Sequence, residues 1–193
     1  MTRGVAAFDF DGTITKRDTL VPFLFSQGRA RMTSAGAAGA VVALPHMRDH
    51  YRDRVKARVI RALFAGRPVD EVERIGQQYS ETLPDTYRAA TLESVVWHQE
   101  QGHERVLVTG SLGVYARPAA EALGFDRVIA VELADDGHGV LTGEMRSANT
   151  RGAEKERRLR ELLGAEPYEL WAYGNSSGDN EMLAMAHHTT WVK

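Results

Sequence analysis

The sequence has 193 residues and a formal net charge of −2 at pH 7, with basic and acidic residues mixed along the chain. This length accommodates one domain with a substantial core and a sizeable insertion, and the charge gives no case for nucleic-acid binding. The absence of cysteine excludes disulfides, thiolate metal sites and cysteine nucleophiles. The most apolar window, residues 35–44, is too short to span a bilayer, and the chain runs directly into a strand pattern with no room for a signal peptide. We therefore expect a cytoplasmic protein without stable membrane insertion.

Short apolar runs that stop at small or polar residues predict strands at about 4–10, 105–109, 168–173 and 189–192. Residues 128–133 and 139–145, joined by Asp135-Asp136-Gly137, predict a strand and its hairpin return. Helical patterns alternate with these strands at 91–101, 114–123, 153–163 and 180–186. The alternation predicts an α/β fold with a Rossmann-like parallel sheet.

Nearly a hundred residues separate the first predicted strand from the second, far more than one crossover helix needs. Within this stretch, residues 20–82 follow a helical pattern; Val55, Val59 and Leu63, for example, share one helix face. We therefore predict a helical cap inserted at residues 16–89, above a core formed by residues 1–15 and 90–193.

The first predicted strand ends in two carboxylates, Asp9 and Asp11, followed by Gly12 and Thr13. In open α/β folds, ligands bind at the carboxyl ends of the strands. Two acids crowded at such an edge repel each other unless a cation shares the site, and an oxygen-preferring ion such as Mg²⁺ fits that requirement. The alternative is an ordinary turn, because Asp-Gly is common turn chemistry.

Two further segments follow or adjoin predicted strands. Thr109-Gly110-Ser111 offers a hydroxyl and backbone N–H groups that can hold a phosphate oxygen, or it is an ordinary loop. Lys155 lies at the start of a predicted helix, where it is either a catalytic cation or a solvated surface charge.

The loop from Gly174 to Asp179 comes directly after the predicted strand 168–173. Asp179 either caps the helix that follows or binds a metal ion. The residues alone leave both alternatives open.

In their order and placement, residues 9–13, Thr109, Lys155 and 174–179 resemble the four motifs of the haloacid dehalogenase-like hydrolase superfamily. The resemblance covers nearly the whole chain. An insertion soon after the first motif is similar to the C1-capped branch that contains the phosphoserine phosphatases. Residues 15–19 and 108–111 look closest to its IB group of small phosphatases.

The resemblance implies a Mg²⁺-dependent phosphatase with an aspartyl-phosphate intermediate. Asp9 would be the nucleophile and Asp11 the general acid and base. Thr109 and Lys155 would bind the phosphate oxygens during catalysis. The resemblance also implies substrate contacts from Thr13, Gly110 and Ser111.

The same resemblance implies that Mg²⁺ is held by Asp9, the backbone carbonyl of Asp11, Asn175 and Asp179. The family often has an acid where this chain has Asn175, which offers an oxygen but no charge. We therefore expect Asp179 to be the main carboxylate ligand of its loop.

Substrate choice in capped relatives falls to the cap and to the loop after the first motif. By position, Asp18 matches an acid that faces the amino group of phosphoserine, and Arg58 lies near a carboxylate-binding arginine. Arg54 or Lys56 can serve instead of Arg58, and a basic run on a helix is also a common solvated face. An amino-acid phosphate is therefore one candidate for the small phosphorylated substrate.

Three alternatives remain open. The apolar residues 40–44 either line a pocket or bring the cap near lipid, so a lipid phosphate is a second candidate substrate. A phosphotransferase or phosphomutase would use the same aspartyl-phosphate. A non-catalytic module that binds a phosphorylated ligand is a third reading of the same motifs.

Overall fold

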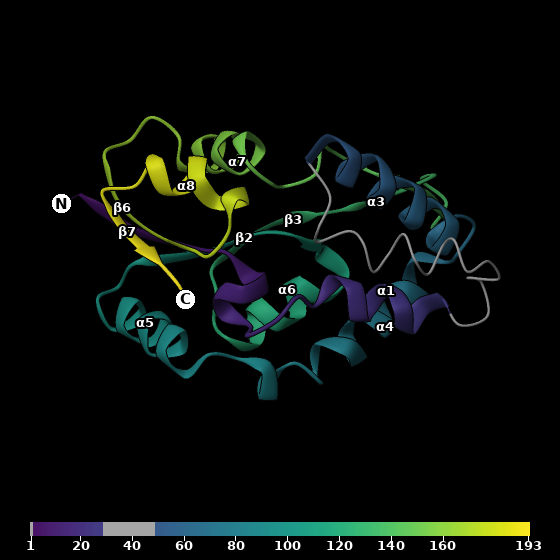
Figure 1. Cartoon of the computed structure of the whole chain (residues 1–193), viewed down its shortest axis with the longest axis horizontal. Coiled ribbons are helices and arrows are strands. Elements are labelled where there is room, and N and C mark those ends of the chain that lie inside the picture. Colours follow the sequence, from purple (N-terminus) through teal and green to yellow (C-terminus); the bar gives the residue numbers. More distant parts are fainter. Residues whose placement is uncertain (1, 29–48) are drawn as a thin grey trace.

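The computed structural model describes residues 2–28 and 49–193 and has a five-stranded parallel sheet at its centre (Figure 1). The strand order is β3-β2-β1-β6-β7. These strands are β1 Arg3–Phe8, β2 Glu104–Leu112, β3 Arg127–Val131, β6 Tyr168–Gly174 and β7 His188–Trp191. The predicted α/β fold with a Rossmann-like parallel sheet is confirmed.

Strand β1 lies in the middle of the sheet because its last four residues, 5–8, are apolar and fully buried. Phe8 pairs with Leu107 of β2 on one side and with Tyr173 of β6 on the other. Alternate residues of β1 point to opposite faces of the sheet. Ala6 and Phe8 belong to one core cluster, whereas Val5 and Ala7 belong to another.

Helices cover both faces, as parallel strands require. On one face lie α7 Ala153–Leu163 and α8 Asn180–Ala184, and on the other lie α5 Ala89–Glu100 and α6 Gly113–Ala122 (Figure 1). The sheet therefore exposes the carboxyl ends of its strands at one edge, where the connections to these helices begin.

The predicted hairpin differs from the observed one. Strand β3 remains in the parallel sheet, and a separate short strand, β4 Leu133–Asp135, pairs antiparallel with β5 Leu141–Met145. The apolar run at 128–133, which predicted a single strand, covers the end of β3 and the start of β4. It is continuous because both strands contribute buried residues: Ala130 and Val131 in β3, and Leu133 in β4. The prediction of one strand in this region was wrong.

The inserted segment leaves and re-enters the core at one place, where Thr15 and Tyr87 form an antiparallel bridge. Its described helices are α1 Leu20–Gly28, α3 Asp49–Phe64 and α4 Val69–Ser80, and the short 3₁₀ turn Pro84–Thr86 precedes the return. Helix α4 packs on α6, and α3 packs along β5. We keep residues 16–89 as the proposed cap and residues 1–15 and 90–193 as the proposed core.

No helix within residues 2–28 and 49–193 is long and apolar enough to span a bilayer. The apolar residues 40–44, which the sequence offered as a pocket lining or a lipid contact, lie outside the described residues.

Candidate active site

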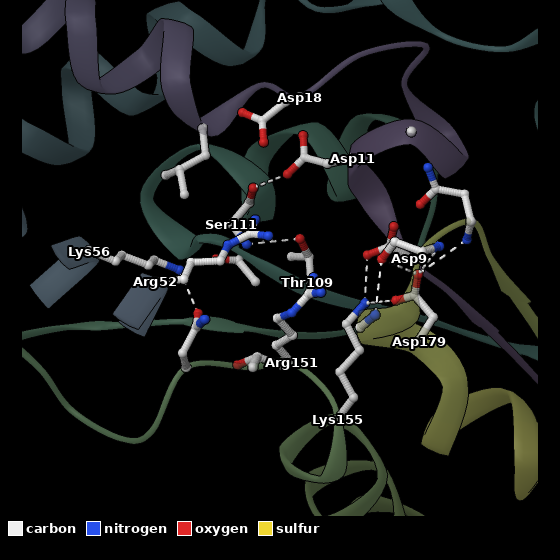
Figure 2. A pocket seen from close by; sticks show the side chains of 18 of the residues that line it. Asp9, Asp11, Asp18, Arg52, Lys56, Thr109, Ser111, Arg151, Lys155 and Asp179 are labelled. Carbon is white, nitrogen blue, oxygen red and sulfur yellow. Dashed lines mark hydrogen bonds and ion pairs between the residues drawn. The ribbon is translucent and has the colours of Figure 1, made fainter. Parts of the chain in front are cut away.

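A cleft of about 340 Å³ lies at the carboxyl edge of the sheet, between the core and the inserted helices (Figure 2). Parallel strands bring Asp9 after β1, Thr109 within β2 and Asn175 after β6 to this edge. The cleft is lined by residues that include Asp9, Asp11, Asp18, Arg52, Lys56, Thr109, Gly110, Ser111, Asn149, Arg151, Lys155, Asn175 and Asp179.

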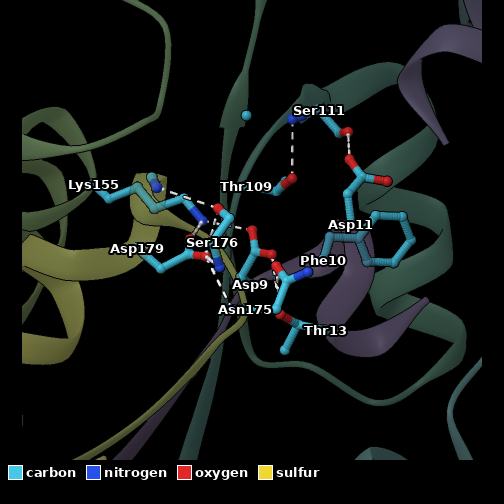
Figure 3. A network of polar contacts seen from close by, with 12 residues as sticks. Asp9, Phe10, Asp11, Thr13, Thr109, Ser111, Lys155, Asn175, Ser176 and Asp179 are labelled. Carbon is cyan, nitrogen blue, oxygen red and sulfur yellow. Dashed lines mark hydrogen bonds and ion pairs between the residues drawn. The ribbon is translucent and has the colours of Figure 1, made fainter. Parts of the chain in front are cut away.

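The ammonium group of Lys155 lies between two carboxylates at the floor of the cleft (Figure 3). Its Nζ donates to Asp9 Oδ1 at 2.5 Å and to Asp179 Oδ1 at 2.7 Å, and all three side chains are buried. Burial alone lowers the pKa of Lys155, but the two carboxylates outweigh it and raise that pKa above its ordinary value. Lys155 is therefore a buried, charged partner of Asp9 and not a solvated surface residue.

Asp11 faces a different set of partners from Asp9, although it lies only two residues further on. The chain leaves the extended conformation directly after Asp9, in a turn of residues 10–14 in which Gly12 has a φ of 83°. Asp11 Oδ1 accepts hydrogen bonds from the Thr19 amide at 2.7 Å and the Thr19 hydroxyl at 2.6 Å, and Oδ2 accepts one from the Ser111 hydroxyl. Burial and the neighbouring Asp18 carboxylate raise the pKa of Asp11 to about 7.

Thr109 presents its hydroxyl to the cleft. Its Oγ1 accepts a hydrogen bond from the Ser111 amide at 2.9 Å, so its own hydrogen remains available for a phosphate oxygen. Ser111 and Gly110 also line the cleft. Residues 109–111 lie within β2 and not in a loop after it, because the strand continues to Leu112, which pairs with Val131 of β3. The predicted end of this strand at residue 109 was wrong, but the segment lies where a phosphate bound beside Asp9 would meet it.

The loop after β6 forms a capping box around Asp179. Asp179 Oδ2 accepts hydrogen bonds from the Asn175 amide, the Ser176 amide and the Ser176 hydroxyl at 2.9 to 3.1 Å. These bonds and Lys155 lower the pKa of Asp179 in spite of its burial. Asp179 precedes α8 as its N-cap residue, but its side chain gives α8 no capping hydrogen bond. The carboxylate instead accepts from the preceding turn, which holds it in a charged form.

The donors at the floor of the cleft fit a hard divalent cation. They are all oxygens: the carboxylates of Asp9 and Asp179 and the amide oxygen of Asn175, which lies 3.4 Å from the Thr13 hydroxyl. In the part of the chain that the structure describes, no three His, Cys, Asp or Glu side chains form a metal-binding group. Two carboxylates, neutral oxygens and water nevertheless suit Mg²⁺, which usually keeps several waters.

Two of the predicted substrate contacts do not reach the cleft. Thr13 is fully buried and donates to Asp9 Oδ2 at 3.1 Å, so it supports Asp9 and does not line the cleft. Arg58 is exposed and points away, because it lies about 200° around helix α3 from Lys56. The structure brings Lys56, one of the stated substitutes, and also Asp18 to the cleft.

The cleft also contains three residues that were not predicted from the sequence: Arg52, Asn149 and Arg151. Arg52 and Lys56 are four residues apart on one helix and therefore share a face, which is a signal that the sequence contains. Asn149 and Arg151 come from the loop before α7 and carry no comparable signal.

Comparison with known proteins gives a consistent result. The sequence model of haloacid dehalogenase-like hydrolases matches residues 6–184. Protein CicA of Caulobacter vibrioides is 32% identical over 185 residues, which cover 94% of this chain and 82% of CicA. A solved structure of a protein with unknown function from Bordetella pertussis has a TM-score of 0.77 at 20% identity, covering 98% of this chain and 89% of that chain. A phospho-aspartyl intermediate analogue of phosphoserine phosphatase has a TM-score of 0.66 at 18% identity, with 98% and 86% covered.

Proposed function

This chain belongs to the haloacid dehalogenase-like hydrolases, and we propose that it is a Mg²⁺-dependent phosphatase that hydrolyses a small phosphomonoester through an aspartyl-phosphate. The resemblance stated from the sequence motifs is thereby confirmed at the level of the family. The observation that carries the proposal is the buried Asp9–Lys155–Asp179 group facing a cleft that Asp11 and Thr109 also line.

In the first step, a carboxylate oxygen of Asp9 attacks phosphorus and the bond from phosphorus to the ester oxygen breaks. Asp11 donates a proton to that leaving oxygen, so an alcohol departs and Asp9 carries the phosphoryl group. Thr109 donates its hydroxyl hydrogen to a phosphoryl oxygen. Lys155 offsets the negative charge that gathers around Asp9.

In the second step, Asp11 removes a proton from water, and the water oxygen attacks phosphorus. The bond between phosphorus and Asp9 breaks, which releases inorganic phosphate and restores both carboxyl groups to their starting forms. Hydrogen bonds from Thr19 and Ser111 hold Asp11 in place through both steps.

Asp9, the Asp11 carbonyl, Asn175 and Asp179 would hold the Mg²⁺ ion. When bound, the ion supplies positive charge that neutralises phosphate oxygens and orients the phosphoryl group. Both oxygens of Asp179 already accept hydrogen bonds within the protein, so its carboxylate would be held in place for the ion.

The charged residues at the rim of the cleft favour a substrate that carries both an anionic and a cationic group. Arg52 and Lys56 lie on one side, and Asp18 lies close to Asp11 (Figure 2). An amino-acid phosphate such as phosphoserine offers a carboxylate to Arg52 and an ammonium group to Asp18. One of the solved structures with this fold is described as a phosphoserine phosphatase.

Phosphate release from a panel of phosphomonoesters, with and without Mg²⁺, tests the proposal. The panel contains phosphoserine, sugar phosphates, nucleotides, a lipid phosphate and p-nitrophenyl phosphate. We expect Mg²⁺-dependent turnover that Asp9→Asn abolishes, while the variant keeps the circular dichroism spectrum of the parent. Turnover that persists in Asp9→Asn contradicts the nucleophile, and silence across the panel with retained phosphate binding favours a mutase or a binding module.

A further inference from the structure

Lys56 connects the inserted segment to the core at the cleft. It lies on α3 and is only 2% exposed, although it carries an amine. Its Nζ donates to the carbonyl oxygen of Gly110 and, at 2.6 Å, to Asn149 Oδ1 (Figure 2). A buried lysine that gives two hydrogen bonds to the core fixes α3 in relation to the end of β2.

Asn149 also donates a hydrogen bond to α3, which adds to the connection between this helix and the core. Its Nδ2 donates to Asp53 Oδ1 at 2.7 Å, and Asp53 lies on α3 beside Lys56. Helix α3 therefore offers one donor and one acceptor to a single buried amide. Asn149 in turn belongs to the loop that leads into α7 and Lys155.

The carbonyl that Lys56 holds belongs to the peptide between Gly110 and Ser111. The N–H of this peptide donates to Thr109 Oγ1 at 2.9 Å, and the Ser111 hydroxyl donates to Asp11. One peptide group thus lies between the hydroxyl that faces the phosphate and the carboxyl that moves the proton. Rotating it displaces both.

We propose that Lys56 is a positioning residue that fixes the Gly110–Ser111 peptide and thereby makes the chemistry depend on the placement of α3 over the cleft. This inference rests on the proposed phosphatase function. It differs from a role in binding an anionic part of the substrate, because two hydrogens of Nζ are already donated to the protein.

The two hydrogen bonds from Lys56 to the core do not require a charged amine. Burial and the nearby Arg52 lower the pKa of Lys56 to about 7. A neutral amine keeps two hydrogens, which is the number that Gly110 and Asn149 accept.

Kinetics with p-nitrophenyl phosphate test the proposal, because this substrate has no second anionic group. In Lys56→Met we expect kcat to fall roughly 10- to 100-fold, the range that a displacement of about 1 Å produces, with KM changed less than threefold. The matched control is Arg61→Met, which removes an exposed cation from the same helix and should behave like the parent. An unchanged kcat in Lys56→Met overturns the proposal, as does a rise in KM restricted to substrates with a second anion.

Amide hydrogen exchange gives a second measurement that does not depend on turnover. The Ser111 amide should exchange faster in Lys56→Met than in the parent or in Arg61→Met, and equal rates overturn the proposal. If the parent releases no phosphate from any ester, the phosphatase function fails, while the exchange result still decides the role of Lys56. If Lys56→Met does not fold, Asn149→Ala replaces it, with the same expected loss of kcat and the same contradiction if kcat is unchanged.

Discussion

Lys155→Met is the substitution that most directly tests the electrostatics of the site. Methionine keeps the length of the side chain and removes the ammonium group that Asp9 and Asp179 share at 2.5 and 2.7 Å. The two carboxylates then remain buried without this cation. The free energy of unfolding should fall as a result.

The size of the loss follows from two opposing terms. At an effective dielectric constant of about 20, each contact contributes roughly 6 kcal/mol of Coulomb attraction. Desolvation of the buried ions costs several kcal/mol each and offsets much of this gain. Removing one partner of a buried ion pair therefore costs about 3 to 5 kcal/mol, because the remaining charge has no partner.

Urea unfolding at pH 7, with EDTA present to remove divalent ions, measures this loss. Lys155→Met should lower the free energy of unfolding by about 3 to 5 kcal/mol with an unchanged dependence on urea. Adding Asp179→Asn to Lys155→Met should recover part of the loss, since only one buried carboxylate is then unpaired. A loss below about 1 kcal/mol, typical of an exposed ion pair, would refute the reasoning.

Two further predictions concern the metal site and acid stability. Asn175→Asp should lower the Mg²⁺ concentration that gives half-maximal phosphate release, because it adds a carboxylate beside Asp9; an unchanged activation curve contradicts this. Burial and the adjacent His103 lower the pKa of His98 to about 4, below its ordinary value. The neutral ring therefore stabilises the fold fully above about pH 6.5, and this contribution, at most about 3 kcal/mol, is lost as the pH falls toward 4. In urea titrations His98→Gln should flatten the decline between pH 6.5 and 4.5, and a slope equal to that of the parent counts against the assignment.

The sequence predicted those parts of the fold whose pattern is local. Helix α7 has the bounds expected from its apolar spacing, 153–163, and β1 ends beside Asp9 as the motif implied. The central strands β1, β2 and β6 are mostly buried on both faces, so each appears in the sequence as a short apolar run, whereas the edge strand β7 is exposed. The positions of these strands determine where the motif residues lie.

The rim of the cleft was less predictable, because it depends on how the inserted helices are oriented. A basic run on α3 places cations all around the helix, and only contact with the core selects the face that carries Arg52 and Lys56 over the one that carries Arg58. One hydrogen-bond partner of Lys56 is Asn149, 93 residues further along the chain. No periodic pattern in the sequence indicates a contact between two residues so far apart.

The turn that begins at Phe10, directly after the extended Asp9, and continues through Gly12 explains how two aspartates so close in sequence acquire different partners. Asp9 directly follows β1, and its carboxylate accepts hydrogen bonds from Lys155 of α7 and from Thr13. After one residue the chain bends, and Asp11 points toward Thr19 and Ser111 instead. A side chain at position 12 would meet the Asn175 amide nitrogen at 2.0 Å, in a backbone conformation that favours glycine. Because the bend separates the partners, burial raises the pKa of Asp9 while the Lys155 ammonium group opposes that rise, and Asp11 has no such cation. In the proposed mechanism, one motif thereby supplies both a nucleophile and a proton donor.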